Sequence, residues 1–391
     1  MRTAASNGKA GTLRFVIREL SVSGYRSVRK IRLPLQQVNV LTGPNGCGKS
    51  NLYNAMFLLA RVADGSFGQV IAQEGGMPSV LWAGATERRV RTAPPSRLLL
   101  SVELDRFGYE LHCGLRQGSP LSLFSLDPEI RGERIWLTGS KNTSIMERKG
   151  ARAAILNSKG KMEQYPSYLY PSESVLAQLS DPNSYPEMFA VREETRSWRF
   201  YHHFRTDQNS PLRRPQPGVL TPVLSHDGLD LAAALQTTIE IGLEEDLQES
   251  IAFAFNGAKL EVRVEATGFR IQLHMPGLLR PLEAPELSDG TLRYLCLMAA
   301  LLSPRPASLL AFNEPETSLH PTLLQPLAKL IARAAENSQL WIATHSFELA
   351  NYIEEFSGQA PIRLDIEAGE TRLVVPKAPQ QQEVQGAPTA G

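Results

Sequence analysis

A glycine-rich segment with the sequence GPNGCGKS, at residues 43–50, constrains the fold of this chain more than any other feature. It follows a short apolar stretch at residues 38–42, which is typical of a buried strand. From Ser50 onward, apolar residues recur every three or four positions, as they do on one face of a helix. Glycines in such a turn let successive backbone N–H groups point at phosphate oxygens, and the helix N-terminus adds a positive dipole. The strand, loop and helix together predict a phosphate-binding site in an α/β fold.

The predicted loop consists of Gly43, Pro44, Asn45, Gly46, Cys47, Gly48, Lys49 and Ser50. At this spacing Lys49 would reach the β and γ phosphates of a bound nucleotide, which makes it a candidate catalytic residue. The hydroxyl of Ser50 is a candidate ligand for Mg²⁺. The alternative is an ordinary glycine-rich turn, but the flanking strand and helix favour the phosphate site.

A second candidate element is an apolar strand at residues 309–312 that ends in Asn313, Glu314, Pro315 and Glu316. A carboxylate at the end of a buried strand beside a phosphate loop can polarise water for attack on the γ phosphate. Glu314 is therefore the candidate general base. The alternative is a strand that ends in solvated acids with no chemical role.

Ser288, Asp289 and Gly290 lie immediately before an apolar helix at about residues 291–302. One interpretation is that Ser288 or Asp289 caps this helix. The other adds a second role, because an exposed serine beside a glycine at a helix N-terminus can bind the γ phosphate of a nucleotide held by another subunit. The residues alone do not decide between the two.

His345 ends a further strand, at residues 340–344. A lone histidine at a strand end is usually a surface or a satisfied residue. This strand, however, follows the Glu314 strand after a single crossover helix at residues 321–336. In a parallel sheet the ends of two such strands meet at one edge. We therefore expect His345 and Glu314 to lie close together.

The remaining pattern predicts five segments along the chain. We expect disordered ends at 1–11 and 377–391, an N-terminal lobe at 12–115, a partly helical inserted subdomain at 116–257, and a C-terminal lobe at 258–376. Antiparallel strands are expected within residues 13–35, broken at Ser23 and Gly24, and hairpins within 98–115 and 259–275.

Bulk composition excludes several classes of protein. The net charge of +1 argues against a general polyanion binder, so any nucleic-acid contact must come from a local patch. Three well-separated cysteines without a CxxC pair fit a reducing compartment and exclude a cysteine zinc site. No apolar stretch is long enough for a membrane span, and residues 1–11 lack the apolar segment of a signal peptide, so we expect a cytoplasmic protein with no membrane partner.

Four segments, GPNGCGKSNL, ELSDGTLRYL, LLAFNEPETSLHP and IATHS, occur in this order. As a set they resemble the RecF/SMC/OLD-like ABC ATPases, and more narrowly the compact bacterial AAA family ATPases with LSDG and EPExxLHP motifs. The resemblance covers about residues 12–350. It implies a P-loop NTPase fold of the ABC-ATPase head type, with ATP and Mg²⁺ as cofactors and a homodimer closed around two ATP molecules.

The resemblance also implies roles for individual residues. Residues 43–50 would be the Walker A loop, followed by Asn51 at the nucleotide, and residues 287–290 the signature, in which Ser288 and Gly290 complete the partner's site. Glu314 would be the catalytic glutamate of Walker B, and His345 the switch histidine that senses the γ phosphate. Residues 318–320 would be the D-loop at the dimer interface. Arg26 and Ser27 would lie against the nucleotide.

The chain departs from the family pattern at Asn313, where many relatives carry an aspartate that holds magnesium through water. An amide keeps an acceptor but loses the charge, so we expect weaker metal binding and slow hydrolysis. This leaves open a clamp or scaffold that binds ATP with little turnover. A nuclease of the OLD type is disfavoured because too few residues follow His345 for its acidic module. The insertion and the LSDG form of the signature argue against a transporter subunit.

The biological role is not specified by these residues. Relatives act in DNA repair, chromosome maintenance and phage defence, and a protein partner is also compatible with the pattern. The segment at residues 198–205 mixes aromatic and basic side chains, as nucleic-acid surfaces do. Its alternation of Trp198, Phe200, His202 and Phe204 fits a half-buried strand better.

Overall fold

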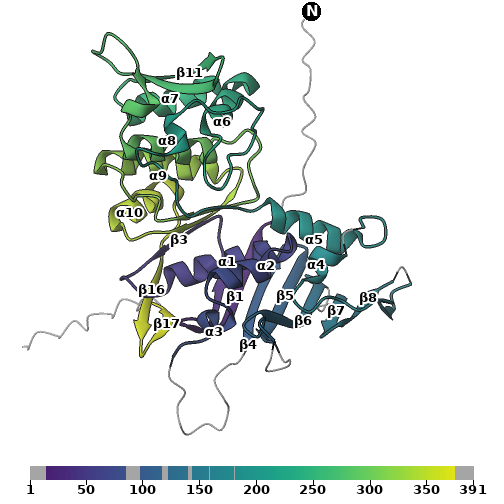
Figure 1. The fold of residues 1–391 in the computed structure, drawn as a ribbon. Coiled ribbons are helices and arrows are strands. Elements are labelled where there is room, and N and C mark those ends of the chain that lie inside the picture. Colours follow the sequence, from purple (N-terminus) through teal and green to yellow (C-terminus); the bar gives the residue numbers. More distant parts are fainter. Residues whose placement is uncertain are drawn as a thin grey trace, which may run out of the picture.

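The computed structural model describes residues 15–84, 97–116, 122–139, 143–157, 159–179 and 181–374. The ends expected to be disordered, 1–11 and 377–391, lie outside these ranges. Figure 1 shows two lobes, one built on a large antiparallel sheet and the other mainly helical, joined through a parallel sheet. The predicted fold class is confirmed.

The antiparallel sheet has eight strands in the order β2-β1-β4-β5-β6-β7-β8-β9. Its strands are β1 (Ile17–Tyr25), β2 (Val28–Pro34), β4 (Arg97–Leu104), β5 (Phe107–Leu115), β6 (Pro128–Leu137), β7 (Ser144–Lys149), β8 (Arg152–Leu156) and β9 (Met162–Gln164). The predicted β4–β5 hairpin is present. The turn between β1 and β2 lies at Arg26 and Ser27, just beyond the expected Ser23 and Gly24, because Tyr25 still pairs with Val28.

Residues 128–164, expected in a partly helical insertion, instead form the four strands β6 to β9, which extend this sheet. Two of their core-facing positions are charged, which weakened the strand pattern. Glu133 of β6 and Arg148 of β7 form a fully buried ion pair of 2.9 Å. The rest of the expected insertion does contain helices, at Val175–Gln178, Pro186–Ser197, Leu231–Thr238 and Glu244–Ala254.

The second sheet has the order β10-β14-β15-β3-β16-β17. Its strands are β3 (Val38–Thr42), β10 (Arg199–Tyr201), β14 (Leu309–Asn313), β15 (Gln339–Ala343), β16 (Ile362–Glu367) and β17 (Glu370–Leu373). The first five are parallel, and β17 returns antiparallel to β16. Because β3, β15 and β14 are neighbours, their carboxyl ends meet at one edge of the sheet.

Ten α-helices surround the sheets in the described part of the chain. They are α1 (Lys49–Ala63), α2 (Phe67–Gln73), α3 (Met77–Val80), α4 (Val175–Gln178), α5 (Pro186–Ser197), α6 (Leu231–Thr238), α7 (Glu244–Ala254), α8 (Asp289–Leu301), α9 (Leu324–Ala334) and α10 (Phe347–Ser357). In Figure 1, α1, α2, α4 and α5 accompany the antiparallel sheet, and α6 to α10 form the helical lobe. A small sheet of β11 (Lys259–Glu265), β12 (Gly268–His274) and β13 (Leu282–Glu283) caps that lobe, with the predicted β11–β12 hairpin.

The parallel sheet separates two hydrophobic cores. Trp341 of β15 belongs to the core of the antiparallel lobe, whereas the next residue, Ile342, belongs to the core of the helical lobe. Neighbouring residues of a strand point to opposite faces, so an uninterrupted apolar strand serves both cores at once. The polar ends of these strands therefore lie where the two lobes meet.

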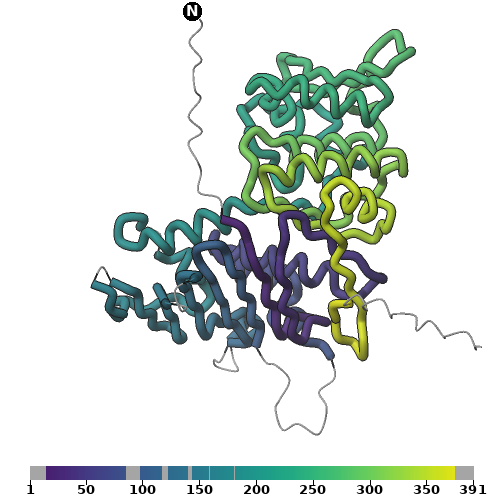
Figure 2. Tube along the Cα trace, turned by 180° about the vertical axis from the view of Figure 1, so that it is seen from behind, coloured from purple at the N-terminus to yellow at the C-terminus, as the bar shows by residue number. Residues whose placement is uncertain are grey.

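The C-terminal hairpin crosses from one lobe to the other. Figure 2 shows β16 and β17 descending from the helical lobe to lie beside β1 and β2. The backbone N–H of Thr371 in β17 donates a hydrogen bond of 2.8 Å to the carbonyl oxygen of Ser27. This contact places the hairpin beside the glycine-rich loop.

Candidate functional site

The glycine-rich loop has the local structure that the sequence predicts. It leaves β3 at Thr42 and enters α1 at Lys49. The ammonium of Lys49 donates to the carbonyl oxygens of Gly43 at 2.7 Å and Pro44 at 3.0 Å, and only 4% of Lys49 is exposed. The lysine is thus folded back over its own loop, and phosphate oxygens would have to replace these two carbonyls as its partners.

Two glycines of the loop are required by what packs against them. A Cβ atom on Gly43 would lie 2.3 Å from the carbonyl oxygen of Leu364, and one on Gly48 would lie 2.1 Å from the hydroxyl of Thr371. Gly48 also has a φ of +100°, which L side chains rarely adopt. The β16–β17 hairpin therefore closes one side of the loop. No local signal in the sequence links Leu364 or Thr371 to a segment more than 300 residues earlier.

A short chain of hydrogen bonds joins the β1–β2 turn to the loop. The amide of Asn51 donates to the hydroxyl of Ser27 at 2.7 Å, and that hydroxyl lies 2.7 Å from the hydroxyl of Thr371. Arg26 lies in the same turn, but its guanidinium forms an ion pair of 2.8 Å with Glu74 of the segment after α2. The structure places Arg26 near the loop while directing its charge to Glu74.

Glu314 and His345 lie together at the edge of the parallel sheet. Nε2 of His345 is 2.7 Å from Oε1 of Glu314, and the two side chains are 37% and 36% exposed. Glu314 has a φ of +48°, and its N–H donates to the carbonyl oxygen of Ala343 at the end of β15. A positive φ is uncommon in a non-glycine residue and turns this side chain out of the strand direction. The expected proximity of the two residues is confirmed.

Glu316 holds the chain around His345. Its Oε1 accepts hydrogen bonds from the hydroxyl of Thr344, from the N–H of His345 and from the N–H of Ser346, at 2.7, 2.8 and 3.1 Å. Its Oε2 is buried without a hydrogen-bond partner in the described part of the chain. No role was predicted for Glu316 from the sequence, and the signal for this role was its place in the same turn as Glu314.

The residues present fit a magnesium ion bound mainly through its nucleotide. Oδ1 of Asn313 is buried and has no hydrogen-bond partner among the described residues, so it can serve as an acceptor at the end of β14. Ser50, at the start of α1, is exposed. Within the part of the chain that the structure describes, no three histidine, cysteine or acidic side chains gather into a metal site. A hydroxyl, an amide oxygen, waters and phosphates are the oxygen ligands that Mg²⁺ accepts.

The signature residues lie at the start of α8. Ser288 accepts a hydrogen bond of 3.1 Å from the N–H of Thr291, so it does cap this helix, and it is also exposed. A Cβ atom on Gly290 would lie 2.5 Å from the carbonyl oxygen of Ser318, which brings the signature against the expected D-loop. Arg293, buried one turn into α8, donates to the carbonyl oxygen of Glu314 at 2.8 Å. The helix start and the Glu314 turn are therefore one packed unit.

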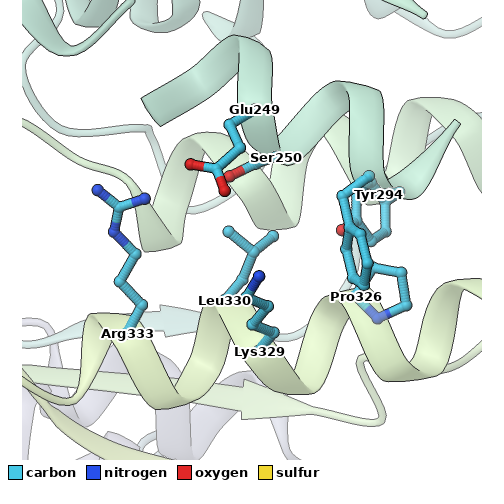
Figure 3. Close-up of a pocket in the computed structure, with 8 residues that line it drawn as sticks. Glu249, Ser250, Tyr294, Pro326, Lys329, Leu330 and Arg333 are labelled. Carbon is cyan, nitrogen blue, oxygen red and sulfur yellow. The ribbon is translucent and has the colours of Figure 1, made fainter. Parts of the chain in front are cut away.

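Figure 3 shows a separate hollow between α7, α8 and α9. Glu249, Tyr294 and Lys329 line it, one from each helix, and no described residue bonds the buried hydroxyl of Tyr294. The hollow has a volume of about 50 Å³, which suits an ordered water rather than a nucleotide. We assign no function to it.

The segment at residues 198–205 forms β10 and the chain just after it. Trp198, Phe200, Tyr201 and Phe204 are all at most 3% exposed. A strand is present as expected, but it covers only Arg199–Tyr201, and the burial of Tyr201 breaks the predicted alternation. These aromatic rings are not free to stack on bases.

Comparison with solved structures defines the class of the fold. The chain is similar to an Smc head bound to the C-winged helix domain of ScpA, with a TM-score of 0.52 and 14% identity over 92% of this chain and 97% of that one. It is equally similar to an Smc head with an extended coiled coil, bound to the C-terminal domain of ScpA, from Pyrococcus furiosus (TM-score 0.52, 14% identity, 92% and 96% covered). The chain therefore has the fold of an SMC head, with a glycine-rich loop at the position of a P-loop.

The family is shown by the sequence. The family described as "AAA domain, putative AbiEii toxin, Type IV TA system" matches residues 38–351, from β3 to α10, and this protein belongs to it. No curated protein matches the chain. Among the described residues, no helix is long and apolar enough to cross a membrane.

Proposed function

We propose that this protein hydrolyses ATP and acts as a switch that closes into a head-to-head dimer around two ATP molecules. The observation that carries the proposal is the 2.7 Å contact between His345 and Glu314, at the sheet edge where β3 delivers the phosphate loop. A base and its partner beside a phosphate loop are what in-line attack by water requires.

The chain's own residues divide the work as follows. Backbone N–H groups of residues 43–50 and the ammonium of Lys49 hold the phosphates. Ser50, directly, and Asn313, through water, would hold Mg²⁺, which neutralises charge that develops on the phosphates. Glu314 accepts a proton from the attacking water. His345 orients the Glu314 carboxylate and contacts the γ phosphate, and Glu316 keeps the backbone of His345 in place.

The second half of the site comes from another copy. Ser288 is exposed at the N-terminus of α8, a place where backbone N–H groups and the helix dipole favour an anion. In a head-to-head dimer it would meet the γ phosphate held by the partner. Because Gly290 packs on Ser318 and Arg293 on the Glu314 turn, that contact is mechanically joined to the catalytic turn of its own chain.

A second candidate function is an ATP-dependent clamp with little turnover. Asn313 supports this function, because its amide lacks the negative charge with which a carboxylate would help to bind Mg²⁺. Steady-state phosphate release decides between the two functions, with Asn313→Asp as the matched variant. Magnesium-dependent release by the natural protein, raised by Asn313→Asp, supports the switch. Absence of release from both proteins, when both bind ATP, supports the clamp.

The biological process in which this protein acts is a further part of the proposal. DNA maintenance, DNA repair and phage defence are consistent with the SMC-type fold and with a family described as a putative toxin of a type IV system. We propose a cytoplasmic protein whose partner is DNA or a second protein. Phosphate release measured with and without DNA across a salt series tests DNA, since stimulation through backbone phosphates falls steeply with salt.

A further inference from the structure

A cleft lies between the two lobes, at the end of the parallel sheet opposite Glu314. Ser308, just before β14, lines it, whereas Asn313 ends the same strand at the phosphate loop. One wall is the C-terminal half of α5 and the other is the chain at residues 304–308. Its volume of about 720 Å³ lies in the range of small-molecule sites. The cleft is therefore separate from the ATP site.

Arg199 presents a positive charge at this cleft. Its Nη1 donates to the carbonyl oxygens of Arg196, Ser197 and Trp198, which end α5. Among the described residues no carboxylate pairs with it. Burial holds the pKa of Arg199 below its usual range, and the nearby cations Arg61 and Arg305 act in the same direction, while Tyr201 opposes them. The carbonyl oxygens at the end of α5 satisfy part of this guanidinium, and an anion in the cleft would offset the neighbouring cations.

The other charged residues of the cleft do not supply an anionic partner for Arg199 within the described residues. Arg305 is exposed on the facing wall, and no side-chain partner binds it within the described ranges. Two acids also line the cleft: Glu193 pairs at 3.3 Å with Arg196, which lines the cleft too, and Glu194 accepts from the indole of Trp198 at 3.2 Å. Two guanidiniums, Arg199 and Arg305, therefore face the cleft with no acid assigned to them.

Apolar side chains form part of the cleft walls. Phe15, Phe189 and Val223 line the cleft together with prolines at 304 and 306. Apolar surface beside a charge lowers the local dielectric and strengthens a charge–charge contact there. The apolar side chains also offer a surface to a carbon skeleton larger than a bare inorganic anion.

We propose that this cleft binds a small organic phosphate, a phosphomonoester whose phosphate group sits between Arg199 and Arg305. Guanidinium groups suit this ligand because their forked donors match phosphate oxygens. The site joins α5 of one lobe to the chain that leads into β14 of the other. It is independent of the proposed ATPase function.

Calorimetric titration of the full-length Lys49→Ala protein tests this proposal, because that background weakens the phosphate loop as a competing site. The probes are adenosine 5′-monophosphate, adenosine and inorganic phosphate, at low salt. We expect saturable binding of the monophosphate, at least about tenfold weaker binding of adenosine, and at least about tenfold weaker binding of the monophosphate after Arg305→Glu. Arg205→Glu, another exposed arginine outside the cleft, serves as the control and should leave binding unchanged.

Several results would overturn the proposal. They are equal affinity for adenosine and the monophosphate, no effect of Arg305→Glu, an equal effect of the control, or no saturable binding at all. Binding of inorganic phosphate alone, still dependent on Arg305, would contradict the organic ligand and leave a free-anion site. Arg199→Gln is the second variant. Because the Arg199 side chain also binds the last carbonyl oxygens of α5, the melting temperature of this variant is measured alongside its affinity. A folded Arg199→Gln protein with unchanged affinity for the monophosphate also contradicts the site.

Discussion

Glu316 holds the backbone of His345: its Oε1 accepts a 2.8 Å hydrogen bond from the N–H of His345, in addition to bonds from Thr344 and Ser346. Glu316→Ala removes an acceptor shared by three donors and frees the chain that carries His345. We expect phosphate release to fall by roughly ten- to a hundredfold, with ATP binding within about threefold of the natural protein.

Glu316→Gln is the control for this prediction, because its amide oxygen can accept the same bonds. It should recover much of the lost rate without changing ATP affinity. If Glu316→Gln loses as much phosphate release as Glu314→Gln, the general base is Glu316 and the assignment of Glu314 is wrong.

Lys49→Ala tests the phosphate loop. The ammonium of Lys49 is the charge expected to meet the β and γ phosphates, and its loss should abolish measurable ATP binding by calorimetry. The fold should persist, with a stability loss of about 1 kcal/mol from the carbonyls of Gly43 and Pro44 that lose their donor. Near-natural ATP affinity in a folded Lys49→Ala protein would overturn the site.

The close approach of α8 to the expected D-loop can be tested through Gly290. Gly290→Ala puts a Cβ atom 2.5 Å from the carbonyl oxygen of Ser318, so the backbone must shift. We expect a loss of about 1 to 3 kcal/mol in the free energy of unfolding measured with urea. Gly68→Ala in α2 is the matched control, because the nearest atom would be 3.9 Å away, and it should be neutral or stabilising. Equal stabilities of the two variants would mean that the signature does not pack on Ser318.

Acid should destabilise the fold through His202. Its ring packs against Tyr53 and Phe57, and burial, followed by His226 and Arg61, lowers its pKa from 6.5 to about 4. Below pH ~6.5 His202 of the unfolded chain binds a proton, whereas His202 of the folded protein stays neutral down to about pH 4. The free energy of unfolding therefore falls as the pH falls from about 6.5 to about 4. Above pH ~6.5 both states are neutral and His202 contributes no slope.

The expected slope from His202 is at most about 1.4 kcal/mol per pH unit. Urea unfolding at several pH values between 5 and 8 measures it, and His202→Phe, which keeps an aromatic ring, should flatten it. An identical pH dependence in the variant would place the acid sensitivity elsewhere, with the half-buried His226 the next group to test.

Local patterns predicted the site better than they predicted its surroundings. The loop at 43–50, the Glu314 strand and the His345 strand each carry their signal within a few residues, and the crossover rule brings the two strand ends together. The packing of Thr371 on Gly48 and the ion pair between Arg26 and Glu74 depend on tertiary contacts, so no spacing announces them. The sequence places Cys47 in the loop but does not show that its side chain is fully buried in the core.

The antiparallel lobe shows the same limit. Hairpins with strict alternation, such as β4–β5, are predictable, but β6 to β9 are interrupted by polar positions such as the buried Glu133. From the sequence alone, a glutamate in a strand is expected to face solvent. Only the structure shows that Arg148 lies opposite Glu133 and allows it to be buried.

The central claim is that two copies close around ATP and that Glu314 reopens them by hydrolysis. Glu314→Gln keeps the size of the side chain and one acceptor but cannot take a proton, so hydrolysis should fall by roughly two or more powers of ten while ATP still binds. The closed state should then persist. The decisive measurement is the molar mass of this variant by size exclusion with light scattering, in ATP with Mg²⁺ and in ADP.

We predict a dimer with ATP and a monomer with ADP. Adding Ser288→Arg, which places a long side chain at the contact between copies, should return the ATP form to monomer without changing ATP binding within a chain. A Glu314→Gln protein that binds ATP, does not hydrolyse it and remains a monomer would contradict the head-to-head switch, leaving an ATPase in which Ser288 only caps a helix.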